Sequence, residues 1–167
     1  MDRVTLGRTG LNVCKNGFGA LPIQRISYEE AAKLLVKAYQ NGIDMFDTAN
    51  FYTDSEKKIG IAMPQMKREN IVITTKTGAS TPDVFWQHLD NSLCMMKTDY
   101  IDIYQFHNPK VCPLPNDGSG LYECMQEAQK KGKIRFIGLT KHRLDTATTC
   151  IESGLYDSLQ FPFSYLS

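Results

Sequence analysis

The feature that most constrains the fold is an alternation of apolar segments with longer amphipathic ones, which recurs roughly every thirty residues. The apolar segments are rich in β-branched residues and end at polar residues, glycine or proline, as strands do. The amphipathic segments repeat their apolar residues at helical spacing. We therefore predict strands at residues 16–21, 43–46, 70–75, 99–106, 134–139 and 159–163, with helices at 27–42, 55–63, 81–96, 120–132 and 144–153 between them.

Several helix ends carry recognisable signals. Ser27 and Glu30 match a capping box, in which a hydroxyl and a glutamate three residues later satisfy the first backbone amides. Asn41, followed by glycine, is a natural left-handed stop for that helix. Thr81, followed by proline and aspartate, predicts the start of another helix.

Repeated strand–helix units are joined by right-handed crossovers, so the pattern predicts an α/β fold with a parallel sheet covered by helices. Two architectures fit, an open doubly wound sheet and a (β/α)8 barrel, and residues 4–13 add an N-terminal β-hairpin. Gly17 and Gly19 lack the third glycine and following helix of a dinucleotide-binding fingerprint, which disfavours the open sheet. Because no linker or low-complexity segment interrupts the pattern, residues 1–167 are interpreted as one domain.

Composition narrows the class of partner. The net charge is +1 and acidic and basic residues are interspersed, so neither nucleic acid nor an anionic membrane is expected as the main partner. No apolar run approaches the roughly twenty residues of a membrane span, and the N-terminus lacks the apolar core of a signal peptide. A cytoplasmic location is therefore predicted.

The cysteines argue against both a disulfide framework and a metal site. They number five and none is spaced as C-x-x-C. We therefore predict reduced thiols and no bound metal. Cys94 and Cys124 lie in apolar helical patterns, where a buried cysteine usually acts as a small hydrophobic residue.

Three predicted strands each deliver an ionisable residue at the carboxyl end. Asp47 follows residues 43–46, Lys76 follows 70–75 and His107 follows 99–106, while Tyr52 lies five residues after Asp47. In a parallel barrel these ends point the same way, so the four side chains would meet at one mouth. Each residue alone has a structural explanation, such as a turn cap or a solvated lysine. Four complementary residues at equivalent positions favour a functional site.

The chemistry of the four residues suggests carbonyl reduction. A tyrosine phenol has a pKa near 10, and a neighbouring cation such as Lys76 would favour its phenolate. Asp47 would keep the lysine charged and fixed, while His107 could hydrogen-bond the substrate oxygen that Tyr52 protonates. The side chains offer neither a nucleophile nor a hydride, so a nicotinamide cofactor would complete the site.

The chain resembles the aldo-keto reductase superfamily over essentially its whole length. The matching segments are LGRTGL, GFGALP, IDMFDTANFYTDSEKKIG, ITTKTG, YIDIYQFHNP and LQFPF, in that order. The resemblance implies a (β/α)8 TIM barrel, with Tyr52 as general acid, Lys76 and Asp47 tuning it, and His107 orienting the carbonyl.

The resemblance also implies a cofactor, NADPH (NADP+ when oxidised). The residues expected beside it are Gly19, Ala20, Asp47, Thr140, Lys141 and Gln160, the last of which matches a glutamine that holds the nicotinamide carboxamide. Thr140 and Lys141 stand where the family commonly has serine and asparagine. The expected substrate is a small-molecule aldehyde or ketone, and Phe51, Trp86 and Phe106 are candidates for an apolar wall, although Trp86 fits helix packing better.

The sequence ends just past the sixth predicted strand, so we expect a barrel truncated after about six strands. Such a sheet has open edges through which the chain could self-associate. The expected function is an NAD(P)H-dependent aldo-keto reductase, with weak or absent turnover by residues 1–167 alone. The alternative is a catalytically inactive barrel fragment that acts as a protein-interaction module.

Overall fold

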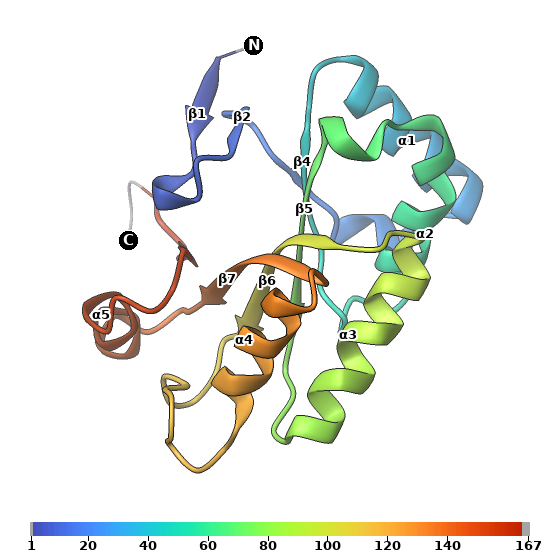
Figure 1. Cartoon of the computed structure of the whole chain (residues 1–167). Helices are drawn as coiled ribbons and strands as arrows, with labels where there is room; N and C mark the ends of the chain where they lie inside the picture. Colours follow the sequence, from blue (N-terminus) through green and yellow to red (C-terminus); the bar gives the residue numbers. More distant parts are fainter. Residues whose placement is uncertain (1, 165–167) are drawn as a thin grey trace.

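A computed structural model describes residues 2–164 of the chain, which form two sheets and five α-helices (Figure 1). Strands β1 (Arg3–Thr5) and β2 (Asn12–Cys14) pair as an antiparallel hairpin. The main sheet is parallel and its six strands are hydrogen-bonded in sequence order. These strands are β3 (Phe18–Gly19), β4 (Met45–Asp47), β5 (Val72–Thr77), β6 (Ile101–His107), β7 (Ile134–Thr140) and β8 (Ser158–Gln160).

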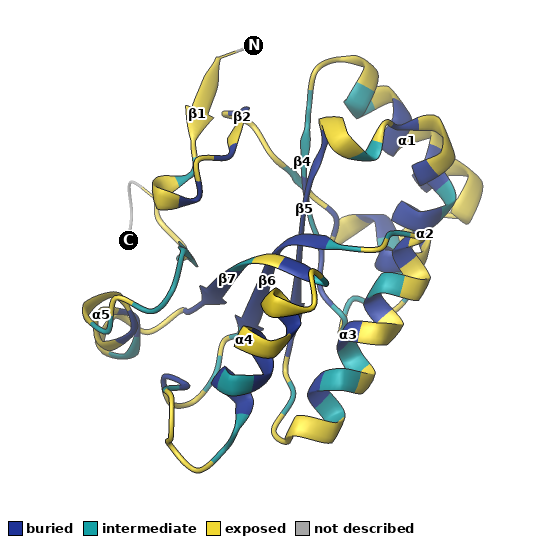
Figure 2. Cartoon of the chain, viewed as in Figure 1, coloured by how far each residue is buried: buried dark blue, intermediate teal, exposed yellow. Residues whose placement is uncertain are grey.

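The helices follow the strands that they cover. They are α1 (Tyr28–Gln40), α2 (Ser55–Ala62), α3 (Pro82–Met96), α4 (Leu121–Lys130) and α5 (Leu144–Glu152). The buried sides of α1 to α4 face the sheet and their exposed sides face outward (Figure 2). A doubly wound sheet reverses its strand order at a switch point, whereas this sheet keeps the sequence order and curls. The fold is therefore part of a (β/α)8 barrel, which confirms the predicted class.

Local helix signals agree with the structure, and one predicted core position does not. The capping box forms: the Glu30 amide donates to Ser27 Oγ at 3.2 Å, and the Ser27 amide donates to a Glu30 carboxylate oxygen at 3.0 Å. Thr81 caps α3. Leu34 recurs at helical spacing with Ala31 and Ala38, which favours a buried position, but it is 43% exposed and Val36 is buried instead. The covered stripe of α1 is therefore rotated from the one that apolar spacing alone selects.

The hairpin covers the amino ends of the main strands. Its Leu11 and Val13 pack against Val72 and Ile103, which line the inner face of the sheet. Asp44, just before β4, holds it there by accepting from the Cys14 amide at 2.7 Å and pairing with an arginine of β1. The hairpin thus closes one end of the barrel interior and leaves the carboxyl ends of the strands for other contacts.

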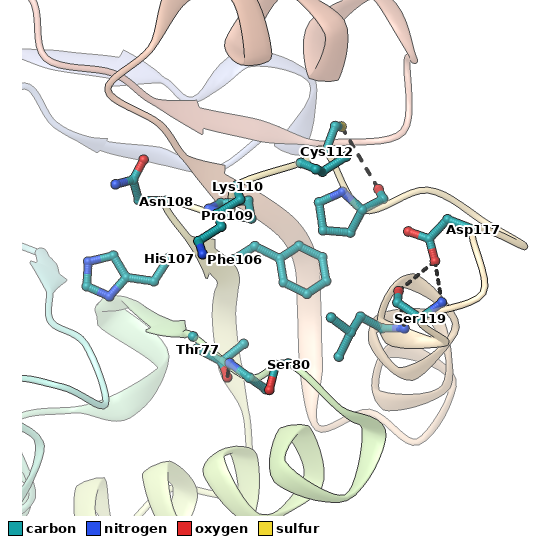
Figure 3. Close-up of a pocket in the computed structure, with 15 residues that line it drawn as sticks. Thr77, Ser80, Phe106, His107, Asn108, Pro109, Lys110, Cys112, Asp117 and Ser119 are labelled. Atoms are coloured by element: carbon teal, nitrogen blue, oxygen red, sulfur yellow. Dashed lines mark hydrogen bonds between the residues drawn. The ribbon is translucent and has the colours of Figure 1, made fainter.

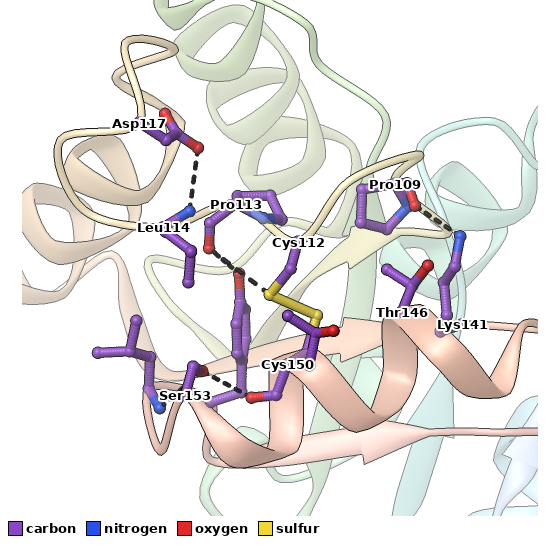
Figure 4. Close-up of a disulfide and its surroundings, with 12 residues drawn as sticks. Pro109, Cys112, Pro113, Leu114, Asp117, Lys141, Thr146, Cys150 and Ser153 are labelled. Carbon is purple, nitrogen blue, oxygen red and sulfur yellow. Dashed lines mark hydrogen bonds between the residues drawn. A yellow bond between two sulfur atoms is a disulfide. The ribbon is translucent and has the colours of Figure 1, made fainter.

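The prediction that every cysteine is a reduced thiol is wrong. Cys112, in the loop after β6, forms a disulfide with Cys150 of α5, and their Cα atoms are 5.7 Å apart (Figure 4). The pair is 38 residues apart in the chain, so sequence spacing did not reveal that neighbouring strand–helix units bring them together. Cys124 is buried as predicted, whereas Cys94 is exposed.

Among residues 2–164, no helix has the length and apolar character needed to cross a lipid bilayer. The same residues contain no cluster of three or more histidine, cysteine, aspartate or glutamate side chains that could hold a metal ion.

Candidate active site

The four predicted residues come together at the carboxyl ends of three neighbouring strands. Asp47 is the last residue of β4, Lys76 is the fifth residue of β5 and His107 is the last residue of β6. Tyr52 lies in the loop between β4 and α2. Because these strands are parallel and adjacent, their ends deliver the side chains to one rim.

Lys76 is the centre of the cluster. It is 2% exposed, and its Nζ donates to Asp47 Oδ2 at 2.7 Å and to the carbonyl oxygen of Thr48 at 2.6 Å. Burial lowers the pKa of the Lys76 ammonium, and the Asp47 carboxylate opposes that shift. Asp47 keeps further partners, since Thr74 Oγ1 and Gln105 Nε2 both donate to its Oδ1. The lysine is therefore fixed at two points beneath the rim.

Tyr52 and His107 face each other across the same cluster. Their rings pack edge to face with centroids 5.9 Å apart, and Lys76 Nζ lies 5.4 Å from the centroid of the Tyr52 ring. The sequence suggested that Lys76 would favour the phenolate. Instead the pKa of the Tyr52 phenol is raised, because burial and then the Asp47 carboxylate oppose its ionisation. The phenol is therefore protonated at neutral pH.

His107 has the character of a neutral hydrogen-bonding group. Its pKa is lowered, chiefly by burial and next by the charge of Lys76. Among the described residues, its buried Nδ1 has no hydrogen-bond partner. A buried polar atom without a partner is uncommon in folded proteins and often marks a place where a ligand or water binds.

A cavity of about 200 Å³ opens at this cluster. Tyr52, Lys76, His107, Thr140, His142, Gln160, Phe161 and Pro162 line it. Its volume is below the roughly 300–1,000 Å³ of a typical small-molecule site. The cavity is therefore of a size for one end of a ligand.

A second cavity of about 500 Å³ adjoins His107 (Figure 3). It lies between residues 77–80 and the segment at residues 106–113, which is the end of β6 and the loop after it, with Phe106 and Leu121 on its apolar walls. Phe51, an exposed residue at the rim, stacks near His107 with ring centroids 6.0 Å apart. Gly78 leaves room for Phe51, because a Cβ there would overlap the Phe51 ring. Phe51 and Phe106 thus lie beside the candidate site.

Trp86 lies elsewhere, as its helical pattern indicated. Its ring packs edge to face on Phe85 with centroids 5.4 Å apart, and Lys131 Nζ lies 4.6 Å from its centroid. Trp86 is therefore a packing residue between helices.

Comparison with known proteins decides the family. The model of the aldo/keto reductase family matches residues 15–164. This chain belongs to that family. The match begins just after β2 and takes in all four clustered residues, so the rim described above lies wholly within the region that matches the family.

Individual aldo/keto reductase relatives match most of the chain. An L-galactose dehydrogenase from Arabidopsis thaliana is 31% identical over 161 residues, covering 88% of this chain and 50% of the relative. An NADH-specific methylglyoxal reductase from Escherichia coli is 26% identical over 185 residues, covering 98% of this chain and 57% of the relative. A solved aldo/keto reductase from Brucella melitensis is 26% identical with a TM-score of 0.78, covering 97% of this chain and 63% of that one. The chain spans about half the length of the curated relatives it matches.

The residues predicted beside a cofactor in this family member divide into two groups. Gly19 pairs with Asp47 in the sheet, and no atom lies within 4 Å of the position that a Cβ would occupy there. Ala20 is fully buried, and Gln160 is exposed at the end of β8, where its Nε2 donates to Asp47 Oδ2 at 3.4 Å. These three residues adjoin the cluster.

Thr140 and Lys141 have their polar groups engaged with the protein. Thr140 lines the smaller cavity, but its Oγ1 accepts from the Asn108 amide at 3.0 Å. Lys141 is 4% exposed and its Nζ donates to the Pro109 carbonyl oxygen at 2.6 Å (Figure 4). Lys141 thus ties the end of β7 to the loop after β6.

Sequence reasoning missed several polar groups of the aldo/keto reductase rim. Thr74 and Gln105 each lie two residues before a predicted site residue on the same strand, so side-chain alternation could have found them. The carbonyl oxygen of Thr48 could not be found in this way, because its role depends on how the loop after β4 folds.

Proposed function

We propose that the protein containing this chain is a nicotinamide-dependent oxidoreductase that reduces an aldehyde or ketone to an alcohol. One observation carries the proposal: a protonated tyrosine and a neutral histidine face each other beside a buried lysine that is paired with an aspartate. The names of two relatives, a dehydrogenase and a methylglyoxal reductase, agree with the interconversion of carbonyls and alcohols. The substrate class is a small-molecule carbonyl compound.

Each residue has a defined role in the proposed reaction. His107 binds the carbonyl oxygen through a ring N–H, and Tyr52 gives that oxygen its proton. The ammonium of Lys76 then stabilises the Tyr52 phenolate, and Asp47 holds the ammonium in place through the 2.7 Å ion pair. Bound NAD(P)H would supply the hydride that goes to the carbonyl carbon.

The residues at the rim fit the nicotinamide end of that cofactor. The open space over Gly19 can admit a flat ring, and the amide of Gln160 can bind a carboxamide. We propose NADPH as the preferred form. Because one relative is NADH-specific by name, binding of both forms should be measured.

The proposal is tested by cofactor binding and by one substitution. Addition of NADPH or NADH to the purified protein that contains this chain should change the nicotinamide fluorescence, and absence of binding by both cofactors would refute the reductase. Tyr52→Phe should lower the rate of aldehyde-dependent NADPH oxidation by about 10²–10⁴-fold, the usual contribution of a general acid, and leave cofactor binding intact. If the rate barely changed, Tyr52 would not be the proton donor.

A second candidate function is favoured by the sheet edges. Within residues 2–164, β3 and β8 each pair with one neighbour in the main sheet, so each leaves an outer edge that another strand could join. We propose self-association or partner binding at these edges as the alternative role. Sedimentation of the purified chain, with and without NADPH, would distinguish a monomer that binds the cofactor from an assembly whose size does not depend on the cofactor. A cytoplasmic location stays a prediction.

A further inference from the structure

The first turn of α2 contains a buried serine with two hydrogen bonds. Ser55 is fully buried, its Oγ donates to the Ala20 carbonyl oxygen at 2.8 Å, and it accepts from Thr48 Oγ1 at 3.0 Å. It therefore joins the end of β3, the loop after β4 and the start of α2.

Thr48 connects this serine to the proposed active site. Its carbonyl oxygen accepts from Lys76 Nζ at 2.6 Å, and its amide donates to the Thr74 carbonyl oxygen at 2.9 Å. The Thr48 side chain is thus held by Ser55 while its backbone holds the lysine. A displacement of Thr48 would move one of the two groups that fix Lys76 Nζ.

The next residue supports the lysine from the other side of its strand. Glu56 is 5% exposed, and its Oε1 accepts from Thr75 Oγ1 at 2.7 Å. Thr75 directly precedes Lys76, and side chains alternate along a strand, so Thr75 faces α2 while Lys76 faces the rim. Ser55 therefore contacts Thr48, whose carbonyl oxygen binds the ammonium, and Glu56 contacts Thr75, which precedes the lysine in β5.

We propose that Ser55 is a positioning residue for Lys76, acting through the hydroxyl and carbonyl groups of Thr48, with Glu56 as a second support through Thr75. A lysine side chain has a long flexible stem, so burial alone does not fix its ammonium. The charged and titratable groups that face it are Asp47, Tyr52, Glu56 and His107. The proposal depends on the proposed function only for its effect on rate, because the position of Lys76 can be measured in the resting protein.

The main test follows Lys76 itself. NMR titration of the Lys76 side chain in the purified chain should give a lower pKa in Ser55→Ala than in the parent, because the ammonium loses the fixed carbonyl of Thr48. Thr48→Val removes the same hydroxyl link but keeps the Ser55 bond to Ala20, so it should lower the Lys76 pKa by the same amount. The double variant should lower it no further, since both changes break one connection.

Two further variants separate positioning from general stability. Thr9→Ala is a matched control, because the buried Thr9 hydroxyl also donates to a carbonyl oxygen and accepts from an amide, but in the hairpin. It should lower the melting temperature without moving the Lys76 pKa. Glu56→Gln keeps a hydrogen-bond acceptor for Thr75. The Lys76 pKa should therefore stay closer to that of the parent protein in Glu56→Gln than in Glu56→Ala.

The rate provides an independent readout. If the proposed function holds, Ser55→Ala should lower kcat by about tenfold with little change in KM, and the alkaline limb of the pH–rate profile should move to lower pH. An unchanged Lys76 pKa in Ser55→Ala, with only a lower melting temperature, would overturn the positioning role. In the protein that contains this chain, a shifted Lys76 pKa without any carbonyl reduction would leave the positioning role standing and refute the proposed function.

Discussion

A buried carboxylate and a half-buried carboxylate at opposite ends of the main sheet differ in how their positively charged partners surround them. Asp102 of β6 is fully buried, and its two oxygens accept from Arg68, Arg135 and the Ile73 amide at 2.7–2.9 Å. Asp47 at the carboxyl end pairs with Lys76 at 2.7 Å, but its side chain is 17% exposed. Asp102 is enclosed, whereas Asp47 lines a separate cavity of about 160 Å³ together with Gln105 and Gln160.

The difference extends to the groups around each pair. Arg68 is itself bound by the Ile71 and Tyr100 carbonyl oxygens, and among the described residues no buried side-chain polar atom of the amino-end cluster lacks a hydrogen-bond partner. The carboxyl-end cluster contains a raised tyrosine pKa, lowered lysine and histidine pKa values and a histidine nitrogen without a partner among the described residues. Barrel enzymes react at the carboxyl end and use the amino end for stability. The Asp102 cluster at the amino end is accordingly expected to stabilise the fold, and the Asp47 cluster at the carboxyl end is the candidate active site.

The largest expected effect is on the carboxyl-end pair. Lys76→Met should lower the rate of carbonyl reduction by about 10²–10⁴-fold, because the Tyr52 phenolate loses its cation. Stability should change little, since methionine fills similar space and Asp47 keeps its bonds from Thr74 and Gln105. Rates per folded molecule and urea unfolding measure the two effects.

The matched control for that change is Lys58→Met. Lys58 is also buried, at 1% exposed, but its Nζ donates to the Ile23 carbonyl oxygen and to Asp54. Because its burial and its two partners resemble those of Lys76, Lys58→Met should change stability as little as Lys76→Met does, without lowering the rate per folded molecule. Equal losses of rate in Lys58→Met and Lys76→Met would remove the distinction between catalytic and structural lysines.

The amino-end pair should respond in the opposite way. Asp102→Ala should lower the free energy of unfolding by about 3–5 kcal/mol, because Arg68 is left without its buried partner. The rate per folded molecule should be unchanged. Asp145→Ala, which removes an exposed partner of Arg143, should alter neither quantity appreciably. A large loss of rate in folded Asp102→Ala would show that the two ends are coupled.

Short-range patterns predicted most of the fold because each signal is local. The capping box at Ser27 and the Thr81 cap depend on residues within one turn, and parallel strand ends require Asp47, Lys76 and His107 to share a rim. These predictions are independent of how the loops pack.

The missed features depend on contacts between separate units. The contacts of Thr48 with Lys76 and of Lys141 with Pro109, like the Cys112–Cys150 disulfide, join neighbouring strand–helix units. The raised pKa of Tyr52 was missed for a related reason. Burial opposes the charge of Lys76, and the extent of burial follows from the packed rim rather than from residue type.

The smallest expected effect is a pH dependence of stability at the carboxyl end. Because the folded pKa of His107 lies below its ordinary value of about 6.5, the unfolded chain binds more protons between those two pKa values. The free energy of unfolding should therefore fall as pH drops from about 7 to 5, and His107→Asn should reduce that fall. Burial also lowers the pKa of His88, so His88→Asn is the matched variant. It should remove a separate part of the fall in the free energy of unfolding. Urea unfolding at each pH measures the slope, and equal slopes in the parent and His107→Asn would mean that His107 is not held in its neutral form by the fold.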